Sequence, residues 1–146
     1  TARTRPRELT RVVSSLRTQR GRISTYLAKR AMGRGDLMGS LEILNAAVVD
    51  LADGDSSTGA AKQALLLRQA CRTEALLTRG FLHLRLGNVE QGRNDGRSAK
   101  KAMELWLDLA RKVGTPIDDE NEQKFRDRHR DLQDRVASAS GDTTSK

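Results

Sequence analysis

Cysteine, histidine and aromatic residues are scarce in this chain of 146 residues, which holds one cysteine, two histidines, one tryptophan, one tyrosine and two phenylalanines. A single cysteine, Cys71, forms no disulfide within the chain and supplies no cluster of sulfur ligands, which excludes disulfide-built and cysteine-ligated zinc domains. Histidine, the most frequent general base and a common metal ligand, occurs only twice. We therefore expect a protein that is not an enzyme and has no metal site and no cofactor.

Long apolar runs are also missing. No stretch of about 18 apolar residues is present, so the sequence predicts no membrane partner and no export signal, and an intracellular location is expected. The arginine- and serine-rich, acid-poor start has the composition of an organelle transit peptide, which remains an alternative. The two prolines, Pro6 and Pro116, both lie at expected element boundaries.

Leucine, alanine, arginine and glutamate dominate the apolar and charged residues of the sequence, and this composition is typical of helices. The pattern predicts an all-α helical bundle of about four to five helices with a central helical hairpin, and no internal repeat is evident. The expected helices cover residues 6–32, 37–51, 59–86, 89–113 and 118–136. The expected organisation is a basic arm and amphipathic helix (1–35), a helical core (36–114), a charged exposed helix (115–137) and a disordered tail (138–146).

Large apolar residues recur at near-heptad spacing in the third and fourth helices. Because the third helix is apolar on most sides, we expect it to be central and to join the protein into a homo-oligomer. The residues expected at this oligomer or core interface are Leu66, Leu77, Phe81, Leu84, Trp106 and Leu109.

The first helix has an apolar stripe formed by Leu9, Val12, Val13, Leu16, Ile23, Tyr26 and Leu27. At 100° per residue, Arg7, Arg11, Arg22 and Lys29 fall on the opposite face. We expect the stripe to dock on another apolar surface, which the sequence does not specify, and these cations to point away from it.

Positive charge is segregated at the start of the sequence. The first 35 residues hold ten basic side chains and one acid, whereas the remainder is close to neutral within a net charge of +8. Such an excess without local counter-charges indicates a polyanionic partner, and we predict nucleic acid, with duplex DNA favoured and structured RNA possible. The predicted phosphate-binding residues are Arg3, Arg5, Arg7, Arg11, Arg17, Arg22, Lys29 and Arg34.

The remaining reactive residues favour structural roles. His83 and Cys71 lie among leucines, so we expect packed side chains there, whereas His129 lies in a charged run and is expected to be solvated. The acids of residues 118–122 suit the first turn of a helix better than a cation site.

One stretch resembles a known family. Residues 63–70 (QALLLRQA) with Glu74, a short polar loop, and residues 105–114 (LWLDLARKVG) are similar to the helical hairpin of small terminase subunits of tailed bacteriophages. The resemblance, over residues 60–114, implies a ring-forming DNA-packaging factor that has no catalytic centre and recruits a separate large ATPase and nuclease. The basic segment occupies the place of that family's N-terminal DNA-binding domain without its expected motif.

A viral origin implies a location in the host cytoplasm or within a virion and a larger viral assembly partner. The alternative function is a virion structural or assembly protein, like a connector or scaffold, whose basic arm tethers it to an acidic partner or to the packaged genome.

Overall fold

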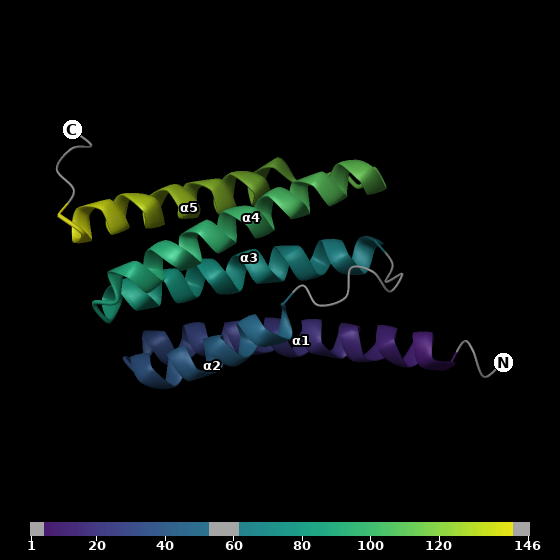
Figure 1. Cartoon of the computed structure of the whole chain (residues 1–146), viewed down its shortest axis with the longest axis horizontal. Coiled ribbons are helices and arrows are strands. Elements are labelled where there is room, and N and C mark those ends of the chain that lie inside the picture. The colour runs from purple at the N-terminus through teal and green to yellow at the C-terminus, as the bar shows by residue number, and fades with distance from the viewer. Residues whose placement is uncertain (1–4, 53–61, 142–146) are drawn as a thin grey trace.

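The protein is a bundle of five α-helices, and the expected all-α fold is confirmed. The computed structural model describes residues 5–52 and 62–141, without the side chains of residues 5–8, 10 and 11, and this part of the chain contains no strand. The helices are α1 (Arg5–Gly33), α2 (Leu37–Asp50), α3 (Lys62–Arg85), α4 (Val89–Val113) and α5 (Asp119–Ala139). Figure 1 shows α1 and α2 on one side of α3, and α4 and α5 on the other.

The loops that join the two helices in hairpins α1–α2 and α3–α4 have the same backbone conformation. Gly35 and Gly87 adopt positive φ angles of 84° and 82°, which favour glycine. Immediately after them, Asp36 and Asn88 are the N-caps of α2 and α4, with similar backbone angles. The two corners therefore share one backbone conformation at an offset of 52 residues.

The backbone hydrogen bonds of the two loops are also equivalent at the offset of 52 residues. The amide of Asp36 donates to the carbonyl of Ala31 at 3.0 Å, and the amide of Asn88 donates to the carbonyl of His83 at 2.7 Å. Each hairpin is also closed by small residues at equivalent positions, Ala28, Ser40 and Ala47 in the first and Gly80, Gly92 and Ala99 in the second, all of them buried. The chain thus contains a structural repeat of two helical hairpins, which the sequence analysis missed because few of the equivalent residues are identical.

α1 packs inward by the face opposite to its apolar stripe. Its buried residues are small, among them Thr18, Thr25 and Ala28. Gly21 lies so close to α2 that an added Cβ would meet the Leu51 side chain at 2.6 Å. Close helix approach requires small side chains, so this face packs inward. The apolar stripe therefore does not pack against the described part of the chain.

The apolar stripe of α1, called the α1 stripe from here on, lies on the surface instead. Its exposed fractions range from 44% for Val13 to 63% for Leu9. Its members are Leu9, Val12, Val13, Leu16, Ile23, Tyr26 and Leu27.

The residues of the expected oligomer or core interface make core contacts within the chain. Leu77 is fully buried in a cluster with α4 and α5, and Phe81 and Leu84 pack against that cluster. Trp106 is 7% exposed and meets the Phe125 ring edge-on at 5.3 Å between ring centres. Leu66 packs beside Trp106, and Leu109 is half-buried. These side chains form core contacts in the single chain.

α5 is more firmly docked than its charge pattern suggests. His129, Leu132 and Val136 form a buried stripe at spacings of three and four. The helix also continues to Ala139, so Ser138 lies inside it rather than in a tail, and residues 142–146 lie outside the described part of the chain. The expected polar loop at residues 53–57 lies outside it as well.

Candidate nucleic-acid interface

The predicted phosphate-binding residues do not form one outward face. Arg3 lies outside the described residues, and the side chains of Arg5, Arg7 and Arg11 are not described. Arg17, Arg22 and Arg34 are exposed. The positions of Arg17 and Arg22 are about 140° apart around α1, so they lie on different sides of the helix.

Lys29 is engaged in an ion-pair network rather than free. Its ammonium group and the Arg128 guanidinium both donate to the Glu74 carboxylate, which connects α1, α3 and α5. Burial lowers the pKa of Lys29, and the nearby cations Arg128 and Lys124 lower it further. Lys29 is 45% exposed and lies at the margin of the face that α1 turns toward α3 and α5, so it is an ion-paired surface cation.

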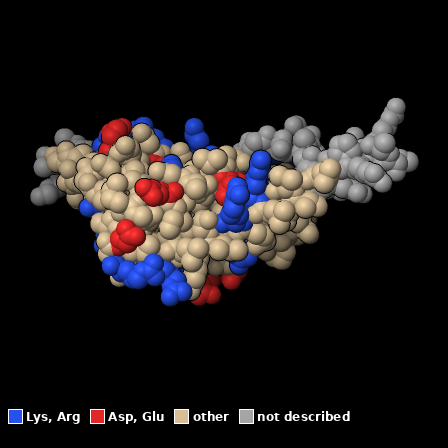
Figure 2. Space-filling view, turned by 90° about the horizontal axis from the view of Figure 1, so that it is seen from below, with Lys and Arg blue, Asp and Glu red and all other residues tan. Residues whose placement is uncertain are grey.

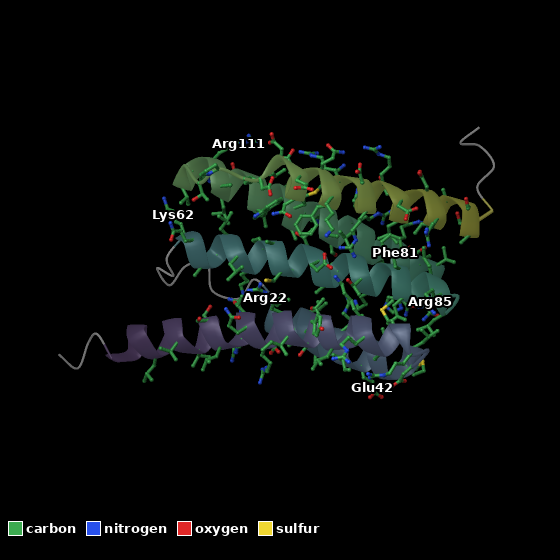
Figure 3. The ribbon with its side chains drawn as sticks, turned by 180° about the vertical axis from the view of Figure 1, so that it is seen from behind. Arg22, Glu42, Lys62, Phe81, Arg85 and Arg111 are labelled. Carbon is green, nitrogen blue, oxygen red and sulfur yellow. The ribbon has the colours of Figure 1, made fainter. Side chains whose placement is uncertain are left out.

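Arg22 lies on the same side of α1, two helical turns before Lys29. Figure 3 places it where α1 faces α3, and its charge reaches the Cys71 thiol. Burial nevertheless raises the pKa of Cys71, so this thiol is a poor nucleophile near neutral pH, as its expected structural role implies. We call the group Arg22, Lys29, Lys124 and Arg128 the basic edge.

Two cations of the basic edge, Lys29 and Arg128, bind the carboxylate of Glu74, and Lys124 lies close enough to Lys29 to lower its pKa. Arg22 and Lys124 are exposed and make no ion pair within the described part of the chain. Sequence reasoning missed Lys124 and Arg128. Their spacing of four residues on α5 shows that they share a face, but only the docking of α5 places that face beside α1.

Arg20 is neutralised within the first hairpin. Its Nε and Nη2 atoms donate to the two carboxylate oxygens of Asp50 at 2.7 and 2.5 Å. The carbonyl of Asp50 in turn accepts from Nη2 of Arg68 on α3 at 2.9 Å, and Arg68 also donates to Ser14 Oγ. Arg20 is thus a structural residue.

The buried histidines have structural surroundings. His83 lies 3.8 Å from Asp95, which is itself held by two hydrogen bonds from Arg79 at 2.8 and 2.7 Å. His129 is 8% exposed and its Nε2 lies 3.1 Å from the carbonyl oxygen of Gly96. The expectation that His129 is solvated is wrong, because it belongs to the buried stripe of α5.

Acid is expected to destabilise the fold through these two histidines. Burial lowers the pKa of both His83 and His129 from the ordinary value of 6.5. The unfolded chain therefore binds protons at a higher pH than the folded chain. The stability that the two neutral histidines contribute is complete above pH 6.5 and is lost as the pH falls below that value. Thermal unfolding measured between about pH 8 and pH 5 tests this. The variant His83→Gln with His129→Gln should show a shallower pH dependence, and an unchanged one contradicts the assignment.

The acids of residues 118–122 begin α5. Asp118 is its N-cap and accepts a hydrogen bond from the amide of Glu120 at 3.1 Å, and the acids that follow occupy the first turn. In the described residues, no group of three or more acids, histidines or cysteines is arranged to hold a metal ion. None of the described helices has the length and apolarity needed to cross a bilayer.

Comparison with known proteins identifies no relative: no family model, no curated protein and no solved structure matches the chain.

Proposed function

We propose that the protein is a non-enzymatic, oligomeric nucleic-acid-binding protein. The observation that carries the proposal is the segregated charge, ten cations against one acid in the first 35 residues. The basic edge extends this charge from α1 to α5 through Lys124 and Arg128. Because the first 35 residues hold a single aromatic residue, Tyr26, base stacking has little support there, and contacts with the phosphates of duplex DNA are favoured.

The biological setting that we propose is viral genome packaging, in a host cytoplasm or a virion. It rests on the similarity of residues 60–114 to small terminase subunits. In this setting the protein holds DNA and a separate partner performs the chemistry. The alternative, a virion assembly protein tethered by its basic arm, is favoured by one observation, the exposed α1 stripe, because an uncovered apolar face suits a subunit that joins a larger particle.

Charge reversal at the basic edge tests the proposal. Arg22→Glu with Lys124→Glu leaves the Glu74 ion pairs in place and should weaken binding to duplex DNA by at least about tenfold at low salt. Each phosphate contact that is lost should also flatten the log–log dependence of affinity on salt by about 0.9. Fluorescence anisotropy with a labelled duplex over a salt series measures both effects.

A matched control variant distinguishes binding at the basic edge from attraction by the net positive charge of the protein. Arg97→Glu with Arg111→Glu makes the same change in net charge at exposed positions of α4. Figure 3 shows Arg111 on the far side of the molecule from α1. This control should bind DNA several-fold more tightly than the edge variant. Equal losses in the two variants would reduce the proposal to nonspecific charge attraction, and a wild-type protein that binds neither DNA nor RNA overturns it.

A further inference from the structure

The α1 stripe is an uncovered helix face with a coiled-coil pattern. Leu9, Leu16 and Ile23 are spaced by seven residues, and the other members lie three or four residues after these positions. The stripe runs about 27 Å along the helix from Leu9 to Leu27. Figure 2 looks onto the α1–α2 side of the molecule, where uncharged residues form a broad area and charged side chains stand at separate points.

The internal repeat shows what kind of structure covers such a face. At the offset of 52 residues, Leu16 and Leu27 of α1 correspond to Arg68 and Arg79 of α3. Arg68 is covered by the first hairpin through its bonds to Ser14 and the Asp50 carbonyl.

Arg79 reaches the same hairpin through Asn45 on α2, at 3.3 Å. Ala75, which corresponds to Ile23, is fully buried. The equivalent face of α3 is thus covered by a helical hairpin, whereas on α1 it is open. In stacked helical repeats an end that stays uncovered has a polar outer face, and α1 lacks one.

We infer that a second copy of the chain covers the α1 stripe, with its own α1 packed antiparallel to the first. This inference rests on the oligomeric part of the proposed function and assigns its surface. The stripe is hollowed between Leu16, Gln19, Arg20 and Ile23. Four residues at this spacing form the hole that receives one side chain of a facing helix.

The charges of α1 permit self-association because most of them lie off the stripe. Arg17, Arg22 and Lys29 are each more than about 100° from its centre around the helix. Arg20 is closer, but Asp50 neutralises it. By helical position, Arg5 and Arg30 lie in line with the stripe but beyond its two ends, so the apolar contact itself holds no unneutralised cation.

The size of the α1 stripe suits a symmetric dimer of the chain. Seven large apolar side chains, each about half exposed, exceed what scattered surface residues provide. A standard interface buries about 800 Å² on each partner, and the stripe offers seven large apolar side chains along about 27 Å of helix toward such an area. A twofold pair uses the same face on both copies and leaves no further stripe open.

Sedimentation velocity of the full chain tests the inference. The wild-type protein should have twice the mass of one chain, and Leu16→Glu with Ile23→Glu should have the mass of one chain. These side chains are 62% and 57% exposed in the single chain, so the variant should keep its helical circular dichroism. The matched control, Met38→Glu with Val49→Glu, changes residues of α2 that are 62% and 74% exposed and should keep the doubled mass.

Cysteine cross-linking tests the orientation without relying on a disruptive variant. In a Cys71→Ala background, a mixture of Leu9→Cys and Leu27→Cys chains should form a disulfide between copies upon oxidation. Neither chain should do so alone. Cross-linking of Leu9→Cys chains with each other would show a parallel pair and overturn the arrangement.

The sedimentation experiment and the DNA-binding experiment can contradict their two proposals independently. Raising the salt concentration should preserve or strengthen the pair, because burial of apolar side chains remains while repulsion is screened, whereas DNA binding weakens. The Leu16→Glu, Ile23→Glu variant should still bind DNA, and the Arg22→Glu, Lys124→Glu variant should still be paired. A wild-type protein that has the mass of one chain at its highest soluble concentration overturns the inference and leaves the stripe to a different partner, such as an acidic helix.

Discussion

Asp95→Ala should lower the free energy of unfolding by about 3 kcal/mol. The Asp95 side chain is 6% exposed and accepts two hydrogen bonds from Arg79, whose side chain is 20% exposed. Removing the carboxylate leaves the guanidinium in a largely buried place with only the distant oxygen of Asn45, and an uncompensated buried charge is costly. Urea unfolding followed by circular dichroism measures the loss.

Two further variants show whether the buried pair is the cause. Asp108→Ala removes an exposed carboxylate that pairs with Lys112 on the same helix, and it should change stability by less than about 1 kcal/mol. Arg79→Leu combined with Asp95→Ala removes both charges and should recover much of the loss. A loss in Asp95→Ala no larger than in Asp108→Ala would contradict the assignment.

The helices and their ends could be predicted from the sequence because their signals are local. The prediction for the fourth helix matches α4 (Val89–Val113), and Gly114, with a φ of 71°, ends it. Asp36 caps α2 through a bond from the amide of Gly39 at 3.0 Å. Caps, glycines and apolar periodicity act over a few residues, so they can be recognised without knowing the packing.

The face by which α1 docks could not be predicted in the same way. Apolar periodicity identifies a face that avoids water, but it does not distinguish the core of one chain from a contact between chains. Here the inward face is selected by close approach at Gly21, and the apolar face remains on the surface. The same limit explains Lys29, whose partner Glu74 is 45 residues away in sequence.

The sequence left open whether the residues of the predicted oligomer or core interface join subunits or fill the core, for a related reason. Leu77 and Trp106 recur at a spacing that suits either a subunit contact or a hairpin core. The second hairpin and α5 fill this space within one chain, which leaves α1 as the open apolar face. The pattern indicated that an apolar surface needs a partner, and the structure determines which surface still lacks one.

Leu132→Ala should be comparably destabilising, by about 3 kcal/mol, because it removes the fully buried anchor of α5. Leu132 packs with Leu77 and Val136, and its side chain lies over Gly80, where an added Cβ would stand 2.7 Å from it. Such close packing leaves a cavity when the side chain is shortened. Since α5 carries Lys124 and Arg128, hydrogen exchange should show α5 opening first, and the basic edge should weaken with it.

Filling the cavity that Leu132→Ala leaves tests whether the lost packing is the cause of the destabilisation. Adding Gly80→Ala to Leu132→Ala places a methyl group where the leucine tip was and replaces a helical glycine, which favours the helix by up to about 1 kcal/mol. The double variant should therefore be more stable than Leu132→Ala alone, whereas Gly80→Ala by itself meets the Leu132 side chain and gains less. Leu105→Ala, which shortens a leucine that is 43% exposed on α4, should cost less than about 1 kcal/mol. If Leu132→Ala costs no more than Leu105→Ala, α5 is not held by this contact, and the basic edge loses its structural basis.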